Sequence, residues 1–190
     1  MSGKNLLPII FSLILTGLSA CLISRSQISQ VSLQELLQTN KINIVYFIDS
    51  NCPISQQMTK YIREISQGID TALLSSQIML QPPITKQDLK NFVAKYEVNL
   101  PVNINTNHQW SQLLGAQITP EVFLYDAKGD LRYHGAINNL YADIGSKRPY
   151  PTQHFLQSNI DSLLLQKTLP FTHQPAVGCI IHHYESKKHP

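Results

Sequence analysis

The chain has 190 residues, of which 15 are Lys or Arg and 12 are Asp or Glu, so its formal net charge is +3. The basic residues do not cluster, and this excludes the electrostatic footprint of a nucleic-acid-binding protein. Once an N-terminal leader is removed, about 170 residues remain, which is enough for one domain with a substantial hydrophobic core.

The N-terminus has the layout of a secretory signal. Lys4 precedes an apolar stretch from Leu6 to Leu18, and small residues then lead to Cys21. The apolar stretch is shorter than the about 20 residues that a membrane-spanning helix needs. We therefore expect residues 1–20 to be a cleaved signal peptide. An uncleaved anchor, or an ordinary signal followed by a chance cysteine, is the alternative.

The run Leu-Ser-Ala-Cys that ends at Cys21 resembles the bacterial lipobox, whose cysteine is acylated. This resemblance implies a lipoprotein held at a membrane of the cell envelope without spanning it. Leu22, and not Asp, follows the cysteine, so in a Gram-negative cell we expect the outer membrane, facing the periplasm. Disulfides persist in that compartment. Residues 21–31 are rich in Ser and Gln and are expected to be a tether.

The next segment predicts a helix, a buried strand and a second helix. Ser32 and Glu35 have the spacing of a capping box, which favours a short helix over 32–38. Residues 42–48 form an almost continuous run of β-branched and aromatic side chains, which is typical of a central strand buried on both faces. A longer helix is expected from Pro53, because proline suits the first helical turn.

The remaining pattern alternates in the same way. We expect a strand over 71–80, a helix capped by Thr85, a strand over 102–104, a short helix over 110–114, a β-hairpin of 121–125 and 131–137, and a helix over 155–165. Residues 32–169 would then form one α/β domain with a mixed central sheet flanked by helices, in the order of the thioredoxin fold. The tail, residues 170–190, carries Cys179 and shows no clear regular structure.

Cys52 lies between the central strand and the helix that begins at Pro53. Backbone N–H groups and the dipole at a helix N-terminus favour thiolate over thiol. The thiolate is the form that attacks disulfides and peroxides. We interpret Cys52 as a reactive nucleophile, flanked by Asn51 and Pro53; a buried structural cysteine is the alternative.

Several short motifs, in order along the chain, resemble the peroxiredoxin-like redoxin-domain proteins of the alkyl hydroperoxide reductase/thiol-specific antioxidant superfamily. They are Asn51-Cys52-Pro53, Thr119-Pro120 with the strand after it, the hairpin 130–139, the segment 147–154, and Val177-Gly178-Cys179. The resemblance implies a thioredoxin fold, a cis Pro120 beside the reactive Cys52, and Cys179 as a resolving or disulfide partner. It also implies a thiol, disulfide or peroxide substrate, or a redox partner protein. We predict no cofactor.

Some positions depart from related active sites. Ser55 takes the place of the second cysteine of Cys-x-x-Cys, so a local disulfide is impossible. Val45 and Asp49 take the places of the Pro and Thr that precede typical peroxidatic cysteines. Whether the chain is a thiol–disulfide oxidoreductase, a thiol peroxidase or no enzyme therefore stays open.

The pair Cys52 and Cys179 allows two interpretations. In one it is a redox-active disulfide that cycles, and in the other it is a permanent staple that ties the tail to the domain. We predict a membrane-anchored, extracytoplasmic thiol–disulfide oxidoreductase of peroxiredoxin-like type, with an antioxidant role, in which Cys52 is the nucleophile and Cys179 its partner.

Histidine suggests an alternative function. The chain has 7 His, and several lie in the tail near Cys179. Cys and His ligands suit copper or zinc, so His182 and His183 are candidate ligands. The alternative is a non-catalytic redox or copper-binding accessory protein on a thioredoxin fold. Against it, Gln56 takes the place of the second cysteine that copper-delivery proteins of this fold use. A solvated tail is the simplest interpretation of these histidines.

Overall fold

The central strand of the fold is the apolar run expected from the sequence. In the computed structural model, which describes residues 32–68, 70–167 and 169–182, β1 spans Ile42–Ile48 and is buried along its whole length. It pairs in parallel with β2 (Leu74–Leu80) and in antiparallel with β5 (Glu121–Tyr125). A strand covered on both faces needs apolar side chains at every position, which explains its composition.

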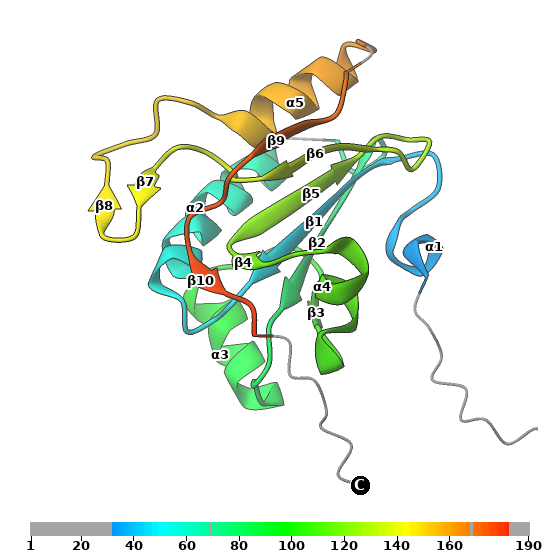
Figure 1. Ribbon diagram of the computed structural model, residues 1–190. Coiled ribbons are helices and arrows are strands. Elements are labelled where there is room, and N and C mark those ends of the chain that lie inside the picture. Colours follow the sequence, from blue (N-terminus) through cyan, green and yellow to red (C-terminus); the bar gives the residue numbers. More distant parts are fainter. Residues whose placement is uncertain (1–31, 69, 168, 183–190) are drawn as a thin grey trace, which may run out of the picture. The chain divides into compact units, whose positions relative to one another are not determined.

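The sheet extends from β1 in both directions. Its order is β3-β2-β1-β5-β6-β9, and the added strands are β3 (Val102–Ile104), β6 (Leu131–Gly135) and β9 (Thr172–Gln174). The β2–β3 and β6–β9 pairs are parallel, whereas β5 and β6 form the expected antiparallel hairpin. The predicted α/β class with a mixed central sheet is confirmed (Figure 1).

Helices cover both faces of this sheet. They are α1 (Leu33–Leu36), α2 (Pro53–Gln67), α3 (Lys86–Lys95), α4 (Gln109–Leu114), preceded by a 3-10 turn at Thr106–His108, and α5 (Phe155–Leu164). Side chains of α2, α3 and α5 pack in one core with Ile44 and Tyr46 of β1. On the other face Val45 and Phe47 pack with residues of α1 and α4. This division follows from the alternation of side chains along a strand.

The helix starts lie where the capping signals predicted them. The Thr85 hydroxyl accepts a hydrogen bond from the Asp88 N–H at 3.1 Å, and the Asp88 carboxylate accepts from the Thr85 hydroxyl and N–H. These hydrogen bonds, the one from the hydroxyl first, lower the pKa of Asp88. Ser32 and Glu35 form the same capping box at α1. The capping boxes thus set the first residues of α1 and α3, and the sequence predicts both starts correctly.

The tail is more ordered than its sequence indicated. It contributes β9 to the edge of the main sheet and β10 (Cys179–Ile180), which pairs in antiparallel with β4 (Ile118–Thr119). In Figure 1 the red tail passes beside β6 and then lies along β4. Strands of two or three residues are too short to show a recognisable alternation of apolar and polar residues in the sequence. A separate ribbon of β7 (Tyr141–Asp143) and β8 (Ser146–Lys147) also escaped prediction.

Gly135 explains how β9 reaches the sheet edge. It has φ +125°, and a Cβ there would overlap the Gln174 backbone, coming within 2.8 Å of its carbonyl carbon. The Ala136 N–H donates to the Gln174 carbonyl at 2.9 Å. Only a residue without a side chain allows this approach and this backbone conformation.

Some expectations fall on residues that the structure does not describe. The signal peptide 1–20, the tether 21–31, the lipid attachment at Cys21 and the candidate ligand His183 lie outside the described residues. Within the described part of the chain, no helix has the length and apolar character needed to cross a membrane.

Candidate functional site

Cys52 occupies the N-cap of α2. Its backbone is extended, Pro53 begins the helix, and the Cys52 carbonyl accepts the Gln56 N–H at 2.9 Å. The residue is 1 % exposed. Free N–H groups and the positive end of the helix dipole therefore surround its position, and both stabilise negative charge on sulfur.

A tight turn delivers the chain from β1 to Cys52. The Cys52 N–H donates to the Asp49 carbonyl at 3.1 Å, and the Asn51 N–H donates to the Asp49 carboxylate at 2.8 Å. The Gln56 amide donates to the Ser50 carbonyl at 2.8 Å. Asn51 itself is exposed. Asp49 thus acts as a turn-forming residue, which gives a structural reason for a carboxylate so close to the cysteine.

Ser55 is buried one helical turn after Cys52. Its hydroxyl accepts a hydrogen bond from the Asp49 N–H at 3.4 Å. It fills the place of a second local cysteine, so the disulfide partner of Cys52 has to come from elsewhere in the chain.

That partner is Cys179. The two cysteines are 127 residues apart in sequence, form a disulfide, and have Cα atoms 6.1 Å apart, inside the usual range for such bonds. Pairing of β10 with β4 sets Cys179 opposite Thr119, and the Thr119 hydroxyl donates to the Cys179 carbonyl at 3.3 Å. The structure therefore brings together Cys52 and Cys179, the two cysteines that were predicted to be partners.

The segment Thr119-Pro120 lies against both cysteines. The peptide bond between them is cis, as the resemblance implied, and the Thr119 carbonyl oxygen lies 3.4 Å from the Cys52 sulfur. Gly178 packs on the same segment: a Cβ there would overlap the Thr119 carbonyl and lie 3.1 Å from Pro120 Cδ. The glycine before Cys179 therefore permits the tail to close over the site.

A polar groove of about 380 Å³ opens beside the turn. Ser50 and Asn51 line one side of it, and α3 residues including Asp88, Asn91 and Lys95 line the other. Asn51 directly precedes Cys52 in the chain, but neither Cys52 nor Cys179 lines this groove. The predicted flanking residue Asn51 is thus one of the residues that line this groove.

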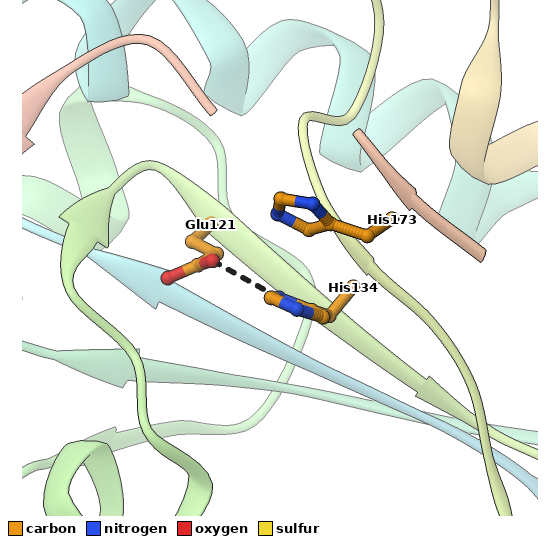
Figure 2. A group of neighbouring side chains, drawn as sticks. All are labelled: Glu121, His134 and His173. Atoms are coloured by element: carbon orange, nitrogen blue, oxygen red, sulfur yellow. Dashed lines mark hydrogen bonds and ion pairs between the residues drawn. The ribbon is translucent and has the colours of Figure 1, made fainter. Parts of the chain in front are cut away.

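A separate polar group includes Glu121, the residue that follows Pro120. Glu121, His134 and His173, on β5, β6 and β9, each offer one ligand atom, and these atoms lie within 4.8 Å of one another (Figure 2). Burial raises the pKa of the neighbouring Tyr133, and the negative charge of Glu121 raises it further. The predicted candidate His182 is exposed and does not belong to this group.

Sequence reasoning does not predict this second group. The hairpin contains His134 and the tail contains His173, but Glu121 carries no special signal in the sequence. Their meeting depends on the parallel pairing of β6 with β9, in which His134 lies opposite His173. That pairing left no periodic pattern in the sequence.

Comparison with known proteins identifies the fold. A family model described as a thioredoxin-like domain matches residues 29–140. The structure is similar to that of a hypothetical protein from Sinorhizobium meliloti 1021, at 22 % identity and a TM-score of 0.66, over 82 % of this chain and 86 % of that one. An uncharacterised conserved protein from Geobacillus kaustophilus matches at 15 % identity and a TM-score of 0.61, over 83 % and 84 % of the two chains.

A thioredoxin-like protein in its oxidised form matches more distantly, at 13 % identity and a TM-score of 0.55, over 73 % of this chain and 86 % of that one. No curated protein sequence matches the chain. At these identities the solved structures show the fold alone. The predicted thioredoxin-like fold is confirmed.

The disulfide is expected to contribute strongly to stability. Closing a loop over a separation of 127 residues corresponds to about 5 kcal/mol in the chain-entropy model. Cys179→Ser should therefore lower the free energy of unfolding of the oxidised protein by several kcal/mol, measured by urea titration. Wild-type protein kept in reductant is the control and should match the variant. Equal stability of the variant and the oxidised wild type would contradict this.

Proposed function

This chain belongs to the thioredoxin-like domain family, and we propose that it is a membrane-anchored, extracytoplasmic thiol–disulfide oxidoreductase of peroxiredoxin-like type. One observation carries the proposal: the disulfide between Cys52, at the N-terminus of α2, and Cys179, on a strand paired to the segment before cis Pro120. A helix N-terminus stabilises a thiolate, so the Cys52 sulfur is suited to act both as a leaving group and as a nucleophile.

In the oxidised form the substrate attacks Cys179, because Cys52 is buried and Cys179 is half-buried. Cys52 is the leaving group of this step, and it is the nucleophile of the peroxide reaction described below. A substrate thiolate bonds to the Cys179 sulfur, the Cys52–Cys179 bond breaks, and Cys52 leaves as a thiolate. A second substrate thiolate then attacks the substrate sulfur of the mixed disulfide and releases Cys179. The substrate is oxidised to a disulfide, and the protein takes up two electrons as two thiols. A leaving thiolate of low pKa makes the first step faster.

The peroxide reaction uses the reduced form. The Cys52 thiolate attacks one oxygen of the peroxide, the O–O bond breaks, and the products are a sulfenic acid on Cys52 and water or an alcohol. The Cys179 thiol then attacks the Cys52 sulfur, which restores the disulfide and releases water. Thiols of a redox partner protein would reduce the disulfide for the next cycle.

The proposed location rests on the sequence of the leader and on the disulfide. Acylation at Cys21 would hold the domain at a membrane, and residues 22–31 would separate the domain from the lipid. Disulfides form and persist outside the cytoplasm, and a Cys52–Cys179 bond fits that environment.

The reduction potential separates cycling from stapling. We expect the Cys52–Cys179 disulfide to equilibrate with glutathione or dithiothreitol buffers at a potential above about −300 mV, as redox-active pairs do. Acid trapping, alkylation and mass spectrometry would measure the fraction oxidised. A potential below about −300 mV would identify a structural staple and remove the oxidoreductase proposal.

Peroxide reactivity tests the peroxiredoxin-like type. Reduced Cys179→Ser protein, treated with hydrogen peroxide and dimedone, should accumulate a sulfenic-acid adduct on Cys52, since no resolving thiol is present. Wild type should instead return to the disulfide, and Cys52→Ser should form no adduct at Cys179. Absence of the adduct in Cys179→Ser would rule out peroxide as a substrate. The measured reduction potential would then be the only test of the thiol–disulfide exchange reaction.

Fractionation of bacterial cells tests the anchor. Wild-type protein should sediment with membranes and carry the mass of acyl chains on its N-terminal peptide, and Cys21→Ser should lose both properties. A His182→Ala variant, changed in the tail, is the control and should stay in the membrane fraction. A wild-type chain in the soluble fraction, with an unmodified Cys21, would contradict the anchor.

A further inference from the structure

We propose that Glu121, His134 and His173 form a binding site for a divalent metal ion of the zinc class. The site lies on a different set of strands from the cysteines, and it uses neither sulfur. It therefore differs from the site predicted from the sequence, whose candidate ligands were His182 and His183. Figure 2 shows the three side chains converging from β5, β6 and β9.

The strand register places all three side chains on one face of the sheet. His134 of β6 lies opposite Phe123 of β5 and opposite His173 of β9. Glu121 lies on the same face as Phe123, because side chains two residues apart on a strand point the same way. The site is thus built on paired backbone, with neighbouring strands about 4.8 Å apart.

The donor set and its spacing suit zinc. Two imidazole nitrogens and one carboxylate oxygen are the ligands of a common zinc arrangement, in which water takes the fourth position. Zn²⁺ bonds of about 2.0–2.2 Å in a tetrahedron separate the ligand atoms by about 3.4 Å. Here Glu121 Oε1 lies 3.2 Å from His134 Nδ1, and all three ligand atoms lie within 4.8 Å. A torsional change in exposed His173 would bring its nitrogen to the ion.

A buried carboxylate points into this site. The side chain of Glu121 is 7 % exposed, and its ion-pair partner is His134. Its other oxygen, Oε2, accepts a hydrogen bond from the Gln117 N–H at 3.0 Å. A buried carboxylate is costly unless its charge is compensated by hydrogen bonds and nearby positive charge. A cation bound by Oε1 and the two histidines would supply that charge.

Neighbouring groups hold the ligands in place. The Phe123 ring stacks on His134 with centroids 5.1 Å apart and an interplanar angle of 15°, and Phe171 stacks on His134 at 5.7 Å. The His134 and His173 rings have centroids 4.2 Å apart. Contacts that fix ligand orientation are a regular part of metal sites, and the Gln117 N–H does the same for the carboxylate.

Calorimetric titration with Zn²⁺ tests the site in the full chain. The protein should be oxidised and then treated with N-ethylmaleimide, so that Cys52 and Cys179 stay in the disulfide and any free Cys21 thiol is blocked. We expect one site in wild type and affinity weaker by at least about ten-fold in His173→Ala. His182→Ala, which removes an exposed tail histidine outside the group, should bind as wild type does.

His173→Ala is the deciding variant, because His173 is exposed and its loss leaves the Glu121–His134 ion pair intact. A thermal melt would verify that the variant folds. Wild-type affinity in His173→Ala, or no Zn²⁺ binding by wild type, would overturn the proposal and leave Glu121–His134 as a structural ion pair. Glu121→Gln should also weaken binding, and it would show that the buried carboxylate is a ligand.

Discussion

Gly178 in the tail packs closely on the backbone of Thr119 and on Pro120, and the rest of the disulfide site depends on this contact. It lets β10 pair with β4, which brings the Cys179 sulfur to Cys52 at the start of α2. A side chain at position 178 would hold the tail away from this segment. The disulfide therefore rests on a fit between two backbone segments, and the segment that receives the tail continues directly into Glu121.

The two polar sites share this connection. The Gln117 carbonyl accepts the N–H of Ile181, two residues after Cys179, and the Gln117 N–H donates to Glu121. The short run 117–121 thus contacts the tail on one side and the carboxylate on the other. The two sites are therefore joined by five residues of continuous backbone.

The sequence predicted those strands and helices whose signal, an apolar run or a capping box, lies within a few neighbouring residues. β1 is apolar throughout because both its faces are covered, and α3 begins at Thr85 because a local capping box forms. β9 has three exposed residues, and its place is decided by the absence of a Cβ at Gly135, far away in the chain. The Cys52–Cys179 pair was predictable because few cysteines were available. The Glu121–His134–His173 group was not, since it exists only through the β6–β9 register.

The disulfide also closes part of the chain into a covalent ring. Residues 52–179 form a closed ring that contains every strand of the main sheet except β1. Yet β1 lies inside the sheet, between β2 and β5 of that ring. The central strand is therefore the one part of the sheet that can be withdrawn lengthwise while the ring stays intact. A mechanical load that pulls the chain from before β1 would pass through α1 and then shear the pairing of β1 with both neighbours before it reached Cys52, where the ring begins.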